Sequence, residues 1–369
     1  MLKKYRKILK WTGITLVTLI VVVVLFGFWF MSLIPDKNIE LEKTVVNDLS
    51  YLSINKIPIK GKILAVVTST QTMGNSGKYT GYELTELSRA YYVFKANGFE
   101  VDVASPLGGK APVVIDDDDM GAFDFAFLND STAQNKTKHT IPIKDVISED
   151  YQAIYFVGGK GAMFDFPNNK TIQSIVKSFH ESNKVIGAVC HGPSALVNVT
   201  LDSGRPLMEN KTISGFTNEE ELLLIPDAKS IFPFLLQEKI IEQGANFNKG
   251  EMYLEKVSHD KNLITGQNPW STWVLAENMI KQLGHTPKHR TITAEENAIK
   301  ILSIYKAQGK QKAKNMIKKM LLKNNQPIDR VLLAQHTMVA AMKGEVGGFF
   351  DILGLLSLTK TCESKGEKI

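Results

Sequence analysis

The sequence predicts an α/β fold with a parallel sheet, preceded by one transmembrane helix and followed by a small helical extension. Three observations lead to this prediction. Short apolar runs alternate with helical periodicity across residues 61–285. Within this region, one strand turns sharply at Cys190. Outside it, residues 11–34 form an uncharged stretch, and residues 286–369 carry lysine-rich helical patterns.

The sharp turn at Cys190 is the most informative position in the chain. Residues 184–189 (KVIGAV) have the composition of a buried parallel strand, and Pro193 suits the first turn of a helix that follows. A nucleophilic residue between such a strand and helix forms a nucleophile elbow. We expect the positive end of the helix to lower the pKa of the thiol. The alternative is a buried structural cysteine, against which the adjacent His191 argues.

Composition restricts the function further. The 369 residues are 44% hydrophobic and 22% charged, which suits one large or two small globular domains. Only two cysteines are present, and Cys362 lies in a polar segment, so a structural disulfide with Cys190 is not expected. No CxxC or HExxH spacing supports a zinc site, and no metal is predicted. The modest net charge of +6 gives no argument for nucleic acid.

The N-terminal region predicts a membrane anchor. Residues 1–10 hold five basic side chains and no acid, and residues 11–34 are long enough to span a bilayer. Trp11 and Trp29 stand near the ends of that stretch, as interfacial aromatics do. We expect an uncleaved signal anchor with a cytoplasmic N-terminus and an extracytoplasmic catalytic domain. A cleaved signal peptide is the alternative. Residues 35–60 are mixed and polar and are interpreted as a tether.

Residues 61–285 are predicted to form the catalytic domain. A strand at 62–68, a helix at 82–97 and a strand at 99–104 make a βαβ unit. A strand at 151–157 ends at Gly158 and Gly159, whose backbone N–H groups could face a ligand as an oxyanion hole. Further predicted elements are a helix at 171–182, a strand at 211–216, a helix at 231–243, a strand at 263–269 and a helix at 271–283.

Two charged segments leave alternatives open. The acidic run at 116–119 is interpreted as an exposed loop, with a cation site as the less favoured alternative. Residues 297–327 contain eight lysines and no acid, interleaved with apolar residues, which predicts basic amphipathic helices. These helices could contact an anionic membrane surface, or they could expose a solvated lysine face over a small helical core.

Several stretches together resemble the ThiJ/PfpI superfamily, a class I glutamine amidotransferase-like group. More closely, they resemble its branch of stress-induced glutathione-independent glyoxalases and chaperones. The resemblance covers residues 62–284 and excludes both the predicted anchor and the C-terminal extension. The motifs that carry it are AVCHGPSAL (188–196), FVGGKGAMFDFP (156–167), TGYELTELSRAYYVFKANGFEVDVASPLGG (80–109), GFTNEEE (215–221) and LITGQNP (263–269).

The resemblance implies a flavodoxin-like sandwich with Cys190 as nucleophile and His191 as catalytic histidine. Glu86 matches the carboxylate that contacts the thiol in this family. It stands four residues before a position usually held by proline, which here is Ala90. The third catalytic acid should follow Phe216 by a few residues.

By that spacing, Glu221 is the choice for the third acid and Glu220 the alternative. The implied oxyanion donors are backbone N–H groups of the Gly158-Gly159 loop and of His191.

The resemblance further implies chemistry on a 2-oxoaldehyde such as methylglyoxal, without glutathione, metal or another cofactor. The thiolate would add to the aldehyde, and His191 and Glu86 would move a proton through an enediol. The adjacent histidine argues against a glutaminase. The remaining alternatives are a deglycase acting on glycated substrates, a chaperone that has lost catalysis, and a cysteine peptidase. The expected partners are a small aldehyde or glycated substrate, a membrane, and a second copy of the chain, but no nucleic acid.

Overall fold

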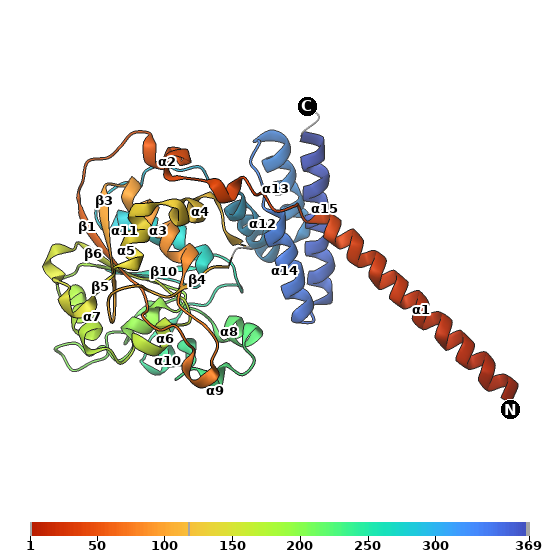
Figure 1. The fold of residues 1–369 in the computed structure, drawn as a ribbon, viewed down its shortest axis with the longest axis horizontal. Coiled ribbons are helices and arrows are strands. Elements are labelled where there is room, and N and C mark those ends of the chain that lie inside the picture. Colours follow the sequence, from red (N-terminus) through yellow and green to blue (C-terminus); the bar gives the residue numbers. More distant parts are fainter. Residues whose placement is uncertain (1, 117–118, 367–369) are drawn as a thin grey trace. The chain divides into compact units, whose positions relative to one another are not determined.

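The computed structural model describes residues 2–116 and 119–366 (Figure 1). Asp117 and Asp118 of the acidic run therefore lie outside the described residues. The chain divides into two compact units. Residues Asn38–Lys306 form an α/β unit, and Met1–Lys37 together with Ala307–Ile369 form a helical unit. The two units are described separately.

The centre of the α/β unit is a seven-stranded sheet in the order β10-β11-β7-β6-β1-β3-β5. Every neighbouring pair is parallel except β10 and β11, so the predicted parallel sheet is confirmed in its main part. The strands are β1 (Gly61–Val66), β3 (Phe99–Ser105), β5 (Ile141–Pro142), β6 (Ala153–Phe156), β7 (Val185–Val189), β10 (Val257–Asp260) and β11 (Leu263–Gly266).

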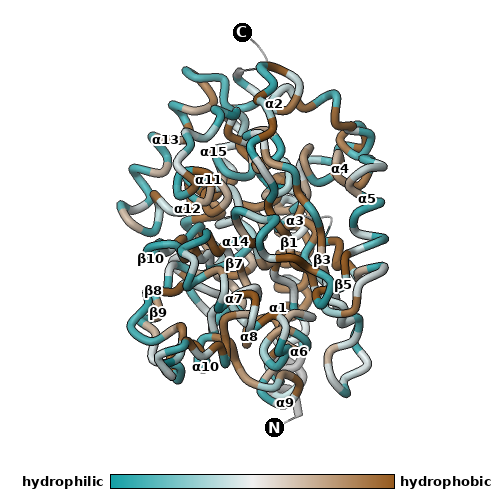
Figure 2. Tube along the Cα trace, turned by 90° about the vertical axis from the view of Figure 1, so that its left-hand side faces the viewer, coloured by the Kyte–Doolittle hydropathy of each residue, from teal (hydrophilic) through white to brown (hydrophobic). Residues whose placement is uncertain are grey.

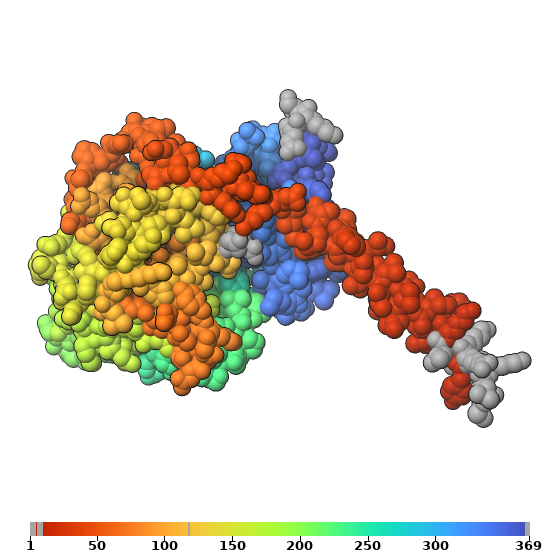
Figure 3. Space-filling view, in the orientation of Figure 1, coloured from red at the N-terminus to blue at the C-terminus, as the bar shows by residue number. Residues whose placement is uncertain are grey.

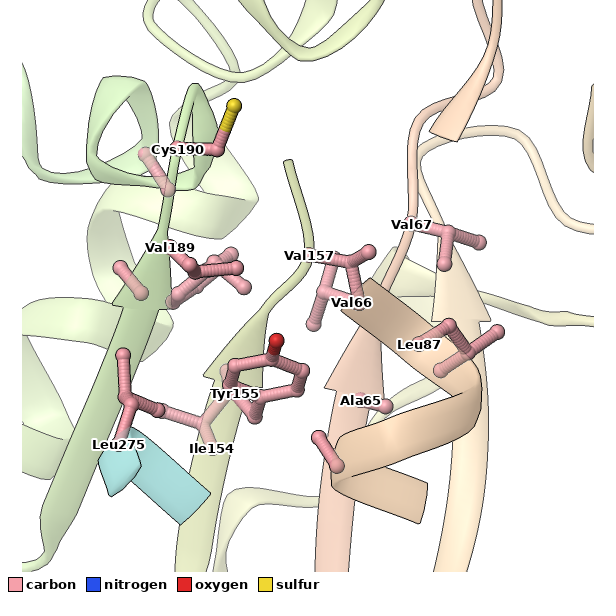
Figure 4. Packing of buried hydrophobic residues seen from close by; sticks show 14 of the residues in the cluster. Ala65, Val66, Val67, Leu87, Ile154, Tyr155, Val157, Val189, Cys190 and Leu275 are labelled. Carbon is pink, nitrogen blue, oxygen red and sulfur yellow. The ribbon is translucent and has the colours of Figure 1, made fainter. Parts of the chain in front are cut away.

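The central strands are apolar on both faces because helices cover both sides, which is typical of parallel sheets. Figure 4 shows the buried side chains of β1, β6 and β7 packed together, and in Figure 2 the central strands are largely brown. Helix α11 (Thr272–Gln282) contacts both β7 and α3 (Leu84–Ala96). Helix α7 (Lys170–Glu181) also packs on β7, through apolar residues spaced three and four apart.

Several predicted elements differ from the observed ones. The predicted helix at 82–97 begins only at Leu84, because Tyr82–Glu83 (β2) pairs with Val113–Val114 (β4). The predicted helix at 231–243 is two helices, α9 (Ala228–Ile231) and α10 (Leu236–Glu242), separated by a segment that contains Pro233.

The predicted strand at 211–216 is only β8 (Thr212–Ile213), which pairs with β9 (Asn246–Phe247) outside the main sheet. Helices α4 (Ala122–Asn129) and α5 (Ser131–Lys138) were not predicted, since α4 reads AFDFAFLN and lacks a polar stripe. The shorter helical elements are η3 (Gly74–Ser76), η5 (Ile143–Asp145), η6 (Ser148–Asp150), α6 (Ala162–Asp165), η7 (Gly192–Leu196), α8 (Asn218–Leu224) and η8 (Pro269–Ser271).

The expected tether at residues 35–60 is largely folded. It contains η1 (Leu41–Lys43), η2 (Val46–Asp48) and α2 (Ser50–Ser53). Leu49 and Tyr51 are buried, and the Asn129 side chain donates hydrogen bonds to the carbonyls of Glu42 and Thr44, at 2.9 Å each. Residues 38–60 therefore belong to the α/β unit, because a few apolar side chains anchor an otherwise polar segment.

The α/β unit also continues beyond residue 285. Arg290 stacks on Trp273, pairs with Glu277 and forms two hydrogen bonds with Glu296 near the start of α12 (Ala294–Gln308). The apolar side chains Ala298, Ile299, Ile301 and Leu302 of α12 are buried, and this helix belongs to the α/β unit as far as Lys306.

The helical unit consists of α1 (Leu2–Leu33), α13 (Lys310–Lys323), α14 (Arg330–Met342) and α15 (Val346–Gly366). Helix α15 packs against α13 and α14. Cys362 is buried within α15 instead of lying in a polar tail, because the helix continues to Gly366, and both cysteines are free. Among the described helices, one segment is long and apolar enough to cross a membrane: Lys10–Leu33, whose exposed side chains are visible in Figure 3.

Candidate active site

The turn after β7 holds Cys190 in a left-handed backbone conformation, with φ at +58°. This conformation is unfavourable for a residue with a Cβ and persists only where surrounding contacts enforce it. The Cys190 N–H donates to the Gly266 carbonyl at 3.0 Å, and its carbonyl accepts from the Phe216 N–H at 2.9 Å. These two bonds hold the backbone of Cys190 on both sides of its Cα, and its side chain lies at the end of the sheet (Figure 4).

The helix expected after the elbow is only the five-residue 3-10 helix η7, because Val197 is extended and Asn198 has a positive φ. Such a short element supplies little dipole. Burial instead raises the pKa of the Cys190 thiol well above its ordinary value, and the Glu86 carboxyl raises it further. The prediction of a thiol pKa lowered by the helix was therefore wrong.

Glu86 lies in the first turn of α3 and is completely buried. The Gly158 N–H donates to its Oε2 at 2.7 Å. Among the described residues, its Oε1 has no partner of standard hydrogen-bond geometry, and the carboxyl interacts with the Cys190 thiol. A Cβ at position 158 would come within 2.5 Å of Glu86 Oε2 and 2.8 Å of Cys190 Cβ. Glycine is therefore needed where these two side chains meet.

Burial raises the pKa of Glu86 to about 8, and hydrogen bonds with Cys190 and Gly158 oppose that rise only in part. Because Cys190 and Glu86 interact, their titrations belong to the pair. Burial raises the pKa of both groups and so favours the state in which both carry their protons, and removal of one proton leaves a single negative charge on the pair. The resulting single negative charge can reside on sulfur while Glu86 holds a proton beside it.

His191 connects the thiol to a second carboxylate. Its Nδ1 lies 3.3 Å from Cys190 Sγ, and its Nε2 lies 2.6 Å from Glu221 Oε2. Burial alone would raise the pKa of Glu221, but the charge and hydrogen bond of His191 bring it below its ordinary value. An ionised Glu221 orients the imidazole, as the third member of a catalytic triad does.

Glu220, the alternative third acid, faces away from His191. Its Oε2 accepts from the N–H and the hydroxyl of Thr217, forming the N-terminal cap of α8. Its Oε1 accepts from Tyr253, Gln267 and Asn268. Glu220 is thus a structural acceptor, whereas Glu221 is the acid that reaches the histidine.

The Gly158-Gly159 loop lies beside the thiol, as its contact with Cys190 Cβ shows. Gly159 has φ at +95°, which glycine adopts freely. Neither the Gly159 N–H nor the His191 N–H donates to an acceptor within residues 2–116 and 119–366. Two unused donors are what an oxyanion hole requires.

Sequence reasoning overlooked two features of the site. Lys160, directly after the two glycines, is a nearby cation that lowers the pKa of both Cys190 and Glu221. Aromatic rings also surround the histidine: Phe216 lies 4.6 Å and Phe232 lies 6.3 Å from His191, measured between ring centroids. Only Phe216 had a sequence signal, as part of the GFTNEEE motif. No cluster of three or more metal-ligating side chains occurs in the described part of the chain.

Comparison with known proteins places this site in a family. Residues 78–221 match the model of the DJ-1/PfpI family. The chain is 31% identical over 238 residues to the glutathione-independent glyoxalase HSP31 of Saccharomyces cerevisiae, covering 61% of this chain and 98% of that relative.

Two solved structures are also similar. The Rapid Encystment Protein of 24 kDa from Francisella tularensis is 35% identical, with a TM-score of 0.57, covering 60% of this chain and 99% of that one. Glyoxalase III from Candida albicans is 28% identical, with a TM-score of 0.57, and the match covers 60% of this chain and 97% of that one. These matches cover nearly the whole length of each relative and confirm the resemblance inferred from the motifs: the chain belongs to the DJ-1/PfpI family.

Proposed function

We propose that the protein is a cysteine-dependent glyoxalase that converts 2-oxoaldehydes, such as methylglyoxal, into 2-hydroxy acids without glutathione. The observation that carries the proposal is the position of Cys190 Sγ, 3.3 Å from His191 Nδ1 and interacting with the buried Glu86 carboxyl. The relatives named glutathione-independent glyoxalases support the substrate class. The aromatic rings around His191 suit a small, partly apolar substrate.

In the proposed reaction, the Cys190 thiolate forms a bond to the aldehyde carbon, and the carbonyl oxygen becomes an oxyanion. The N–H groups of Gly159 and His191 stabilise that oxyanion until a proton completes a hemithioacetal. The His191 imidazole then removes the C1 proton to give an enediol, and Glu86 delivers a proton to C2. The product is a thioester of the 2-hydroxy acid. Water hydrolyses it, which releases the acid and regenerates the thiol.

The test follows methylglyoxal loss and lactate formation by the full-length chain in detergent, with no glutathione present. Cys190→Ser and Glu86→Gln should each reduce turnover by about 10²-fold or more. Cys362→Ser is the matched control, because it makes the same change at a buried cysteine in the helical unit. Unchanged turnover in Cys190→Ser would contradict the mechanism. An inactive wild type with an alkylatable Cys190 would redirect the search to glycated substrates.

We further propose that α1 anchors the protein in a membrane, with residues 1–10 in the cytoplasm and the α/β unit on the other side. The support is the 24-residue segment Lys10–Leu33, with a mean hydropathy of 2.7 and none of its apolar window buried. The basic residues that precede it favour this orientation. Alkaline carbonate should leave the full-length chain in the membrane pellet, and its release would contradict the anchor.

A further inference from the structure

The turn between α14 and α15 exposes a cluster of apolar side chains, here called the hairpin tip (residues 338–350). Met338 and Met342 are four residues apart on α14, and Val346 and Phe350 are four apart on α15. Their exposed fractions are 49%, 60%, 68% and 59% in that order. Exposed apolar side chains gathered at one end of a helical hairpin are typical of a surface that binds a protein or a membrane.

Contacts within the helical unit place the hairpin tip beside α1. The ring centroid of Phe349 lies 6.3 Å from that of Phe26. Nearer the C-terminal end of α1, Arg330 on α14 donates to the Leu33 carbonyl at 2.5 Å, and the Lys360 ammonium on α15 donates to the Ser32 carbonyl. Helix α15 therefore contacts the C-terminal part of the apolar segment.

The level of Phe26 decides what surrounds the hairpin tip. Phe26 precedes Leu33 by seven residues, so it lies about 10 Å further along the axis of α1. If α1 spans a bilayer and Leu33 marks its boundary, Phe26 lies inside the hydrocarbon region. Phe349, in contact with Phe26, then reaches the same depth. Helices that lie in a membrane interface bury their apolar faces by about 5–10 Å.

We propose that the hairpin tip inserts into the outer part of the same bilayer that α1 crosses, so that lipid acyl chains cover Met338, Met342, Val346 and Phe350. The proposal rests on the membrane anchor proposed above and not on the glyoxalase activity. It gives the helical unit a second membrane attachment, distinct from the lysine-rich face of α13.

The charges of the hairpin tip are compatible with this environment. Residues 338–350 contain two charged side chains, Lys343 and Glu345, and these form an ion pair at 2.6 Å. Just beyond the tip, Asp351 pairs with Lys310 at 2.7 Å. Paired charges cost less to bring near hydrocarbon than isolated ones, and the Lys343 stem is long enough to keep its ammonium among the headgroups.

Photocrosslinking of the full-length chain in phosphatidylcholine vesicles tests the proposal. The photoreactive residue benzoylphenylalanine replaces one aromatic side chain at a time. Phe350 is the test position, Phe28 on α1 is the positive control, and Tyr79 on the α/β unit is the negative control; all three are largely exposed. We expect lipid adducts, detected by mass spectrometry, at positions 28 and 350 but not at 79.

Three results would overturn the proposal. Lipid adducts at position 28 without adducts at 350 would leave the anchor intact and place the hairpin tip in water. Adducts at 350 to another protein chain, increasing with the ratio of protein to lipid, would make the tip an interface between copies. No lipid adduct at 28 would remove the anchor itself, while lactate formation, measured on the same samples, would report the glyoxalase separately.

Discussion

Cys190 shows how far single residues can be interpreted before the fold is known. The corner between β7 and η7 could be predicted, because small residues and a proline follow an apolar run. The protonation of the thiol could not be predicted. It depends on burial and on Glu86, which reaches Cys190 from a helix about one hundred residues earlier in the chain.

Substitution of the two neighbouring acids of α8 should have different effects: one should reduce turnover and the other should reduce stability. Glu221→Gln removes the charge that faces His191 Nε2, so kcat should fall by about 10²-fold or more with little change in Tm. Glu220→Gln disturbs the helix cap and its buried donors, which should cost about 1–3 kcal/mol of stability and spare most of kcat. Steady-state kinetics and thermal unfolding of both variants test this, and reversed effects would exchange their roles.

Lys160 should set the pH at which the site becomes active. Its positive charge lowers the pKa of Cys190, so Lys160→Met should raise the apparent pKa of kcat/KM above the wild-type value. Lys160→Arg retains the charge and should leave the pH profile close to wild type. An unchanged profile in Lys160→Met would show that its ammonium does not act on the thiol.

At the scale of elements, α3 shows what a departure from a family pattern means. The resemblance places proline where this chain has Ala90, inside the helix. A proline there would remove the N–H that donates to the Glu86 carbonyl. That carbonyl already accepts a hydrogen bond from the Tyr155 hydroxyl at 2.9 Å. In this chain the Glu86 carbonyl therefore has two donors, the Ala90 N–H and the Tyr155 hydroxyl.

Ala90→Pro should consequently cost about 1 kcal/mol of unfolding free energy, instead of the roughly 3 kcal/mol usual within a helix. Urea denaturation measures the cost. In the Ala90→Pro/Tyr155→Phe double variant the Glu86 carbonyl loses both donors, so the loss should exceed the sum of the single effects. Additive costs would mean that Tyr155 does not compensate for the missing N–H.

The elements that were predicted well are those with a strong local signal. The strands β1, β6, β7 and β11 are short apolar runs, and β3 alternates apolar with polar residues; their partners follow from the alternation with helices. The elements missed have weak or contrary local signals. Helix α4 is apolar nearly all round, and the folded part of the expected tether is polar, with Leu49 and Tyr51 as its buried contacts. Both segments fold because distant parts of the chain pack against their apolar side chains, which local sequence does not reveal.

For the whole molecule, the buried Glu86 makes stability depend on pH. Its pKa is 4.5 when unperturbed and about 8 when folded. Between these values the folded chain holds a proton that the unfolded chain has released. Unfolding free energy therefore falls as pH rises from 4.5 to 8, by up to about 1.4 kcal/mol per pH unit for this group.

Glu86→Gln removes this contribution. The variant should be more stable than wild type at pH 8 and should differ least from it near pH 4.5. Thermal unfolding across that range measures the difference between the two proteins, which isolates Glu86 from other buried acids. Glu219→Gln, at an exposed acid, should follow the wild-type curve. A Glu86→Gln curve parallel to wild type would mean that the carboxyl is ionised throughout.

The hydrogen bond from Cys190 N–H to Gly266 has a consequence for biosynthesis. The ribosome delivers β1 and β6 first, but β7 receives its second neighbour, β11, only when residues 263–266 have emerged. Glu221 also follows the cysteine in the order of translation. The nascent chain thus carries Cys190 before the Gly266 carbonyl can accept its N–H and before Glu221 can bind His191. The full set of contacts around Cys190 therefore forms late, when most of the α/β unit has been made.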